Sequence, residues 1–373
     1  MTQRLRLTLG AWRQLAGKLD VRRAHSSSLA RIPYWLSGAG YSLLTRIQDA
    51  SHADGLKTAK LSPPIFLLGF WRSGTTFLHE LFCCDHRFGF PSTYACLNPS
   101  HFLLSEAHLQ ALSQQQARRP MDNMLYSWGS PQEDEFALLC LGAPSPYEAL
   151  IAPSLMRDAR LLLDLRSRSR QEQERWADVL QHFLRLLTIQ QGKTMVLKSP
   201  THGFRLPLLA SLFPGARFVI IERNPYEVFA SNLKLWPTLF GMYALESFSL
   251  DEIEAFILAA YVIHEEAIAE GEPSVPPRSL ARVRYEDLVA NPIGEMERLY
   301  GQTGLDEFET VRPKLEQHVA SVSNHKRNRF RLSREQRAHV DAAWGTKIKE
   351  RGYAWPDGYI EIADSVVTAG NSN

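Results

Sequence analysis

A short apolar run that ends in a glycine-bracketed turn constrains the fold of this chain more than any other feature. Residues 65–70 read I-F-L-L-G-F, and the turn that follows reads G-F-W-R-S-G-T-T over 69–76. Unbroken apolarity is typical of a strand that is buried on both faces of a parallel sheet. Because parallel strands need crossover connections, usually helices, the segment predicts an α/β fold.

Further segments of the chain repeat this alternation of strand and helix. Strands are expected at 195–198, 217–223 and 282–285. Helical patterns are expected at 75–82, 176–187, 204–213 and 253–268, and from 225 and 292 onward. Such alternation predicts a P-loop-like central parallel sheet flanked by helices, in a single domain. His264 belongs to the apolar face of its helix, so we expect a core histidine there.

Composition divides the chain into three parts. We expect a basic helical segment at 1–60, the α/β domain at 61–345 and a tail at 346–373, with an irregular cap or substrate region at 100–170. Arg and Lys outnumber Asp and Glu by eight to two within 1–50, whereas the net charge of the whole chain is only +2. That small total argues against nucleic acid as a partner.

The basic N-terminal segment has two interpretations. Its mixture of aromatic residues, leucines and arginines suits either packing against the domain or docking on a membrane surface. No apolar run approaches the ~18–20 residues of a transmembrane helix, and no secretory signal is recognisable. Four cysteines without a C-x-x-C pair suit a reducing compartment. We therefore expect a cytoplasmic protein, with peripheral contact to the inner face of a membrane through residues 1–50 as the sharper alternative.

The turn at 69–76 has the glycine spacing of a phosphate-binding loop but lacks its lysine. Thr75 stands where that motif requires lysine. Free backbone N–H groups and the helix dipole still favour an anion there. Ser73, Thr75 and Thr76 add hydroxyl groups, and Arg72 adds a positive charge. We expect a ligand with a 5′-phosphate and a short extension that is not a nucleoside triphosphate.

The loop resembles a segment of a known family. The resemblance rests on five consecutive residues, Arg72, Ser73, Gly74, Thr75 and Thr76. They are similar to the 5′-phosphosulfate loop of sulfotransferases that use 3′-phosphoadenosine 5′-phosphosulfate (PAPS), in the arginine form of the bacterial and tyrosylprotein branches. Cytosolic sulfotransferases carry lysine there, and a tryptophan after the second threonine stacks on adenine. Phe77 occupies that position here and offers a ring for the same contact.

A second segment strengthens the resemblance. Sulfotransferases bind the 3′-phosphate of PAPS with an arginine at a strand end and a serine eight residues later, and Arg223 and Ser231 have that spacing. A guanidinium is always charged and matches phosphate geometry. The resemblance covers roughly 64–335. Within it, the basic stretch 324–331 is either a loop over the nucleotide or a solvated face.

Transfer of a sulfuryl group to a hydroxyl needs a base, charge stabilisation and in-line positioning, and it demands no metal. Lys198 matches a family lysine that stabilises the leaving phosphate and the transferred group, with a surface charge as the alternative. His202 lies upstream of Arg223 much as the catalytic histidine does in cytosolic enzymes, but a packing role is also open. Glu133 and Glu80 are the other candidate bases.

The sequence predicts a sulfotransferase that moves a sulfuryl group from PAPS to a hydroxyl, in line and without a metal. Its basic, aromatic N-terminus favours a small hydrophobic or lipid-like alcohol as acceptor. One alternative is a kinase or NTPase with Glu222 as the Mg²⁺-binding acid, against which Thr75 argues. A non-catalytic membrane-associated scaffold on the same fold is the other alternative.

Overall fold

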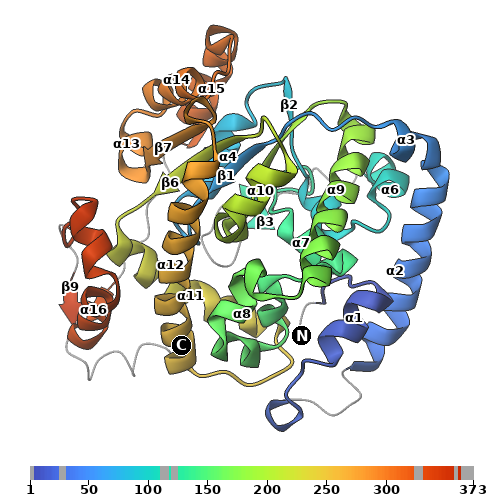
Figure 1. The fold of residues 1–373 in the computed structure, drawn as a ribbon, viewed down its shortest axis with the longest axis horizontal. Coiled ribbons are helices and arrows are strands. Elements are labelled where there is room, and N and C mark those ends of the chain that lie inside the picture. Colours follow the sequence, from blue (N-terminus) through green and yellow to red (C-terminus); the bar gives the residue numbers. More distant parts are fainter. Residues whose placement is uncertain are drawn as a thin grey trace.

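Five parallel strands form the central sheet of the chain (Figure 1). The computed structural model describes residues 4–24, 31–109, 117–118, 125–322, 331–356 and 360–362. The strands of the sheet are β1 (Ile65–Leu68), β2 (Phe88–Gly89), β5 (Thr194–Lys198), β6 (Arg217–Glu222) and β7 (Leu280–Arg284). Their order is β2-β5-β1-β6-β7, so β1 has a neighbour on each side. The predicted parallel α/β sheet is confirmed.

Helices surround this sheet (Figure 1). In chain order they are α1 (Leu9–Ala16), α2 (Ile32–Ser51), α3 (Ala53–Thr58), α4 (Thr75–Phe82), α5 (Thr93–Leu97), α6 (Phe102–Leu109), α7 (Glu135–Leu141), α8 (Ala159–Leu163), α9 (Arg170–Gln191), α10 (Leu206–Leu212), α11 (Pro225–Tyr243), α12 (Leu250–Gly271), α13 (Tyr285–Ala290), α14 (Pro292–Gln302), α15 (Phe308–Val322) and α16 (Arg334–Glu350). Two short strand pairs lie outside the central sheet: β3 (Ala117–Arg118) with β4 (Leu125–Tyr126), and β8 (Arg331–Ser333) with β9 (Ile360–Ile362).

The unbroken apolar run at β1 arises because both faces of the sheet are covered. Successive side chains of a strand point to opposite faces. Phe66 and Leu68 pack in a cluster with residues of α9 and α10, whereas Ile65 and Leu67 pack in a second cluster with residues of α4 and α14. All four side chains are fully buried. The central strand therefore tolerates no polar position on either face.

The N-terminal helices pack into the same core as the domain. Trp12 of α1 is fully buried, and the backbone N–H of Thr8 donates to the carbonyl of Cys140 in α7 at 2.9 Å. Helix α2 crosses the chain closely, since a Cβ on Gly38 would lie 3.2 Å from the backbone of Leu9. Packing against the domain is thus observed for the inner side of this segment. No helix in the described ranges is both long and apolar enough to cross a membrane.

The C-terminal part of the described chain packs beside the carboxyl end of β6. Trp344 of α16 is buried, and the Asn224 side chain donates to the carbonyl of Ala354 at 2.8 Å. The predicted boundary at 345 falls inside α16, so the first residues of the predicted tail continue this helix. Residues around 354 therefore lie next to the segment that carries Arg223.

Candidate active site

Three adjacent strands bring the sequence-predicted segments to one edge of the sheet. Strand β1 pairs with β5 on one side and with β6 on the other. Lys198 ends β5, the loop 69–74 follows β1, and Arg223 follows β6. Ligands of open α/β sheets bind at the carboxyl ends of the strands. Segments more than a hundred residues apart in sequence therefore share one site.

The loop after β1 depends on two glycines. Gly74 is the N-cap of α4 and has φ +99°, and a Cβ on it would lie 2.2 Å from the ring of Tyr285. A Cβ on Gly69 would lie 2.6 Å from the Oγ of Ser73. Arg72 also has a positive φ, of 71°, which costs energy for a residue with a side chain. The first turn of α4 has no side-chain cap, so its backbone N–H groups face the loop.

The loop and the start of α11 contact each other directly. The Nε of Arg72 donates to the Oγ of Ser231 at 2.8 Å, across 159 residues of sequence. The guanidinium of Arg223 donates to the backbone carbonyl of Arg72 at 3.1 Å. The predicted 5′-phosphosulfate loop and the predicted 3′-phosphate pair are thus brought together.

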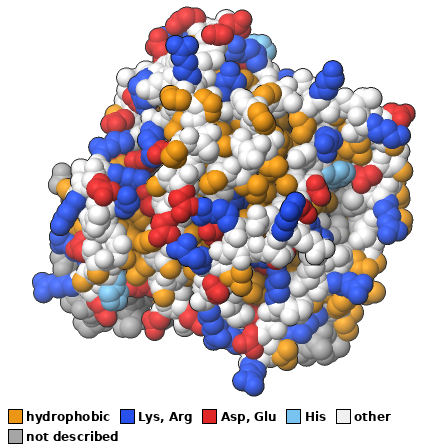
Figure 2. Space-filling model, in the orientation of Figure 1, with side chains coloured by type: hydrophobic (Ala, Val, Ile, Leu, Met, Phe, Trp, Pro, Cys, Tyr) orange, Lys and Arg blue, Asp and Glu red, His pale blue; other side chains and the backbone are white. Residues whose placement is uncertain are grey.

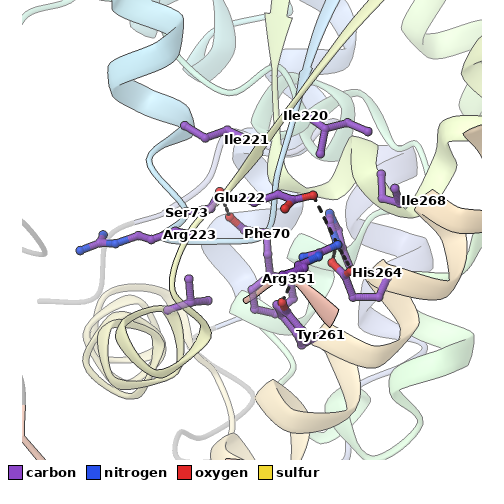
Figure 3. Close-up of a pocket in the computed structure, with 12 residues that line it drawn as sticks. Phe70, Ser73, Ile220, Ile221, Glu222, Arg223, Tyr261, His264, Ile268 and Arg351 are labelled. Carbon is purple, nitrogen blue, oxygen red and sulfur yellow. Dashed lines mark hydrogen bonds and ion pairs between the residues drawn. The ribbon is translucent and has the colours of Figure 1, made fainter. Parts of the chain in front are cut away.

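Arg223 is held on the loop side of β6. Its guanidinium forms an ion pair with Glu227 at 2.6 Å and lies 4.4 Å from the centre of the Tyr285 ring. Figure 3 shows that the side chains of Glu222 and Arg223 point in opposite directions. Glu222 instead forms ion pairs with Arg282 and Arg351.

A small pocket lies behind the loop and is lined in part by Phe70, Ser73 and Glu222 (Figure 3). Arg351 crosses it and contacts Glu265 and the hydroxyl of Tyr261. His264 also borders the pocket, is buried, and meets the Phe70 ring edge-on at 5.7 Å. The predicted core position of His264 is confirmed. The charged side chains beside it, Glu265 and Arg351, form an ion pair with each other in the wall of the pocket.

Lys198 and Glu133 form an ion pair at the end of β5. The Nζ of Lys198 donates to the Oε1 of Glu133 at 2.8 Å, and the lysine side chain is only 1% exposed. The hydroxyl of Tyr147 donates to the other oxygen of Glu133, and the indole N–H of Trp71 donates to Tyr147 at 3.2 Å. Burial, and then the charge of Glu133, raises the pKa of Tyr147 well above its ordinary value. Trp71 belongs to the loop, so the chain of contacts links it to Lys198.

The two acids after Glu133 pair with residues just beyond β5. Asp134 accepts hydrogen bonds at 2.8 Å from the Oγ of Ser199 and from the Nε2 of His202. Glu135 forms an ion pair with Arg205 at 2.6 Å. The side chains of both acids are completely buried. The two consecutive carboxylates therefore both bind the segment 199–205 that follows β5.

His202 lies inside the core rather than beside the Lys198–Glu133 pair. Its side chain is 0% exposed, and its ring meets that of Phe66 edge-on at 5.4 Å. A 3₁₀ turn over Pro200–Arg205 directs the side chain inward. Burial opposes ionisation of Asp134, but the charge and hydrogen bond of His202 and the Ser199 hydroxyl outweigh it and hold the pKa of Asp134 below its ordinary value.

Comparison with known proteins identifies the family. The sulfotransferase family model matches residues 63–310. Omega-hydroxy-beta-dihydromenaquinone-9 sulfotransferases Stf3 of Mycobacterium bovis and Mycobacterium tuberculosis are each 39% identical over 300 residues, which cover 80% of this chain and 77% of theirs. This chain belongs to the sulfotransferase family. The resemblance to the sulfotransferase family drawn from the sequence is thereby confirmed.

Solved sulfotransferases share the fold. STF9 of Mycobacterium avium has a TM-score of 0.68 at 16% identity and covers 95% of this chain and 99% of its own. STF1 of Mycobacterium tuberculosis H37Rv has a TM-score of 0.63 at 19% identity, with 90% and 92% covered. Identities this low support the architecture alone. The P-loop-like α/β fold of the sulfotransferase is therefore confirmed on independent grounds.

The remaining predicted residues of the sulfotransferase lie around the loop. Ser73 and Thr75 are buried, and the hydroxyl of Ser73 donates to the carbonyl of Phe70 at 2.8 Å. Thr76 and Phe77 are partly exposed on α4, where Phe77 packs against the cluster on that face. Glu80 has a different setting from these residues.

Glu80 lies further along α4, 3.7 Å from His318 of α15. Residues 324–330 of the basic stretch fall outside the described ranges. Within those ranges, no group of three or more His, Cys, Asp or Glu side chains is arranged to hold a metal ion. Tyr147, Trp71 and Tyr285 were not predicted, because no sequence spacing marks them.

The glycine at the loop generates the first prediction. Replacing Gly74 by alanine should cost at least about 2 kcal/mol more unfolding free energy than replacing Gly192, because both have positive φ but only Gly74 meets a ring. Urea unfolding of Gly74→Ala and the matched Gly192→Ala measures the difference. Equal losses would show that the contact with Tyr285 does not constrain the loop.

The Asp134 carboxylate gives the second prediction, which concerns the dependence of stability on pH. Asp134→Asn should lower the unfolding free energy by about 2–4 kcal/mol at neutral pH, because it removes the buried carboxylate to which Ser199 and His202 are bonded. Since the folded pKa lies below the ordinary value of 3.8, this stabilisation is present above that pH and is lost as pH falls through the folded value. Urea unfolding at several pH values measures the gap to wild type.

The exposed Asp54→Asn serves as the control for that experiment, since its side chain is 100% exposed. It should leave the unfolding free energy unchanged at every pH. A gap between wild type and Asp134→Asn that stays constant down to pH values well below 3.8 would contradict the assignment.

Proposed function

We propose that this sulfotransferase moves a sulfuryl group from PAPS to the hydroxyl of a lipid-like alcohol. The observation that carries the proposal is the hydrogen bond between Arg72 and Ser231, at 2.8 Å. It joins one segment suited to the 5′ end of the nucleotide to another suited to the 3′-phosphate. A single doubly phosphorylated adenosine is the ligand that would use both.

The residues at the loop fit the phosphosulfate end of PAPS. Gly74 at φ +99° leaves no room for a side chain, and α4 begins without a side-chain cap, so its first N–H groups suit an anion. Thr75 and Thr76 add hydroxyl donors in the same turn. Arg72 contributes the charge that lysine supplies in nucleoside triphosphatases.

Arg223 and Ser231 would hold the 3′-phosphate. The guanidinium of Arg223 is fixed by Glu227 and by the Tyr285 ring, so little rotamer freedom is lost on binding. Phe77, which is partly exposed on α4, would stack on the adenine. When bound, PAPS supplies a sulfuryl group whose bond to the bridging phosphosulfate oxygen breaks as the acceptor oxygen attacks sulfur.

Lys198 and Glu133 would carry the proton and the charge. The ammonium of Lys198 suits the negative charge that develops on the bridging oxygen, and the carboxylate of Glu133 suits the acceptor proton. Glu133 is 18% exposed, whereas His202 is fully buried, so only the carboxylate is open to an acceptor. His202 then serves to position Asp134 and the segment that bears Glu133.

The acceptor class rests on the relatives. Relatives at 39% identity are named for an omega-hydroxylated dihydromenaquinone, which is a long hydrophobic alcohol. We extend that class, and not that compound, to this chain. The kinase or NTPase alternative loses support because Glu222, its required acid, is engaged by Arg282 and Arg351.

Turnover of labelled PAPS tests the assignment of roles. Glu133→Gln and Lys198→Met should each lower kcat roughly a hundredfold or more, because each removes a group that acts at the reacting atoms. The KM for PAPS should change less than kcat for Glu133→Gln. Transfer of radiolabel into long-chain primary alcohols in detergent measures both constants.

Glu80→Gln is the matched control, because Glu80 is the competing glutamate and faces His318 of α15. It should retain the wild-type rate. Full activity of Glu133→Gln, or a collapse of Glu80→Gln alone, would reassign the base. Absence of transfer by the wild type to any alcohol would favour the scaffold alternative.

A further inference from the structure

Helix α2 carries an exposed apolar face. Among the described residues, five of the ten large hydrophobic side chains that are exposed lie on this helix, with exposed fractions from 42% to 72%: Ile32, Trp35, Leu36, Leu43 and Ile47. Spacings of three, four and seven residues place them on one side of a 3.6-residue helix, and Ala39 and Gly40 fill the gap between them. The resulting stripe, from 32 to 47, is roughly 22 Å long. Figure 2 shows hydrophobic side chains along the right-hand edge, where α2 lies in Figure 1.

The opposite face of α2 is fixed to the protein, which determines what points outward. Tyr34 stacks on Trp12 with ring centres 4.5 Å apart. The buried side chain of Gln48 donates to the carbonyl of Pro99 at 2.9 Å and accepts from the N–H of Leu103 at 3.0 Å. The helix therefore cannot rotate to bury its apolar stripe without breaking these contacts.

Charge on this helix is arranged around the stripe. Arg31 precedes its first residue and the exposed Arg46 lies beside its last, whereas the helix contains a single acid, Asp49. That acid points toward α9, where it lies 3.2 Å from His182. The outward face of α2 thus combines apolar side chains with positive charge, and the one carboxylate of the helix is paired with His182.

We propose that this face of α2 docks on an anionic lipid bilayer, with the helix lying in the plane of the surface. Trp35 and Leu36 would enter the boundary between headgroups and acyl chains, and Arg31 and Arg46 would meet lipid phosphates. A second copy of the chain fits this face less well. It would bring like charges together, and one narrow helical stripe buries less area than stable dimers need.

Two helices, α1 and α7, connect the docking helix to the site of the proposed function. Helix α1 packs between α2 and α7, and Thr8 bonds to Cys140 of α7. Helix α7 begins two residues after Glu133. If the acceptor is lipid-like, as proposed above, docking would bring the site to the surface where that acceptor resides. Vesicle binding itself requires no turnover, so it can fail or succeed independently of the proposed activity.

Co-sedimentation of the full chain with lipid vesicles tests the proposal. The wild type should bind vesicles of phosphatidylcholine with phosphatidylglycerol more tightly than vesicles of phosphatidylcholine alone, and salt should weaken the former. The double variant Leu36→Glu with Leu43→Glu should lose at least about tenfold in vesicle affinity. Arg46→Glu should reduce the preference for phosphatidylglycerol.

The matched control is Leu161→Glu with Leu250→Glu, which places two charges at exposed leucines outside α2. It should bind vesicles like the wild type. Equal loss in both double variants, or unchanged binding in the α2 variant, would overturn the proposal. So would a wild-type dimer in light scattering that the α2 variant converts to a monomer, because the face would then be a protein interface. Thermal unfolding of each variant establishes that it is folded.

Discussion

The contact between the loop after β1 and the first turns of α11 is the constraint on which the site depends. The side chain of Arg72 donates to the hydroxyl of Ser231, and the side chain of Arg223 donates to the backbone carbonyl of Arg72. Neither contact would form if β1 and β6 were not neighbours in the sheet. Two cationic segments are thereby held at a fixed separation before any ligand binds. Such preorganisation lowers the entropy that binding must overcome.

A second set of contacts fixes the other side of the site. Three consecutive acids, at 133–135, each pair with a different basic residue of the segment that continues β5. The inner two pairs are fully buried, while the outer pair of Glu133 and Lys198 lies nearest to solvent. The two buried pairs therefore hold the backbone in place, whereas the pair of Glu133 and Lys198 has a carboxylate that is partly open to solvent. A buried charge that loses its partner is strongly destabilising, so the inner pairs keep this segment in register.

Local patterns predicted most of the sheet and the two segments that meet at the carboxyl ends of β1 and β6. An unbroken apolar run followed by a glycine-bracketed turn has few structural solutions, and β1 with α4 matches its predicted bounds closely. Contacts between distant segments could be predicted less well from the sequence. His202 resembled a catalytic histidine by its position in sequence, yet the 3₁₀ turn after β5 buries it beside Asp134. Tyr147 has no local signature, and only the folded chain brings it to Glu133.

The central claim is that Arg223 and the loop after β1 bind opposite ends of one nucleotide. Calorimetric titration of 3′-phosphoadenosine 5′-phosphate and of AMP, which lacks the 3′-phosphate, tests it directly in wild type and Arg223→Ala. The account predicts that the variant loses roughly a hundredfold in affinity for the bisphosphate and only about twofold for AMP. Equal losses for both nucleotides would contradict it, because Arg223 would then act only through the shape of the loop.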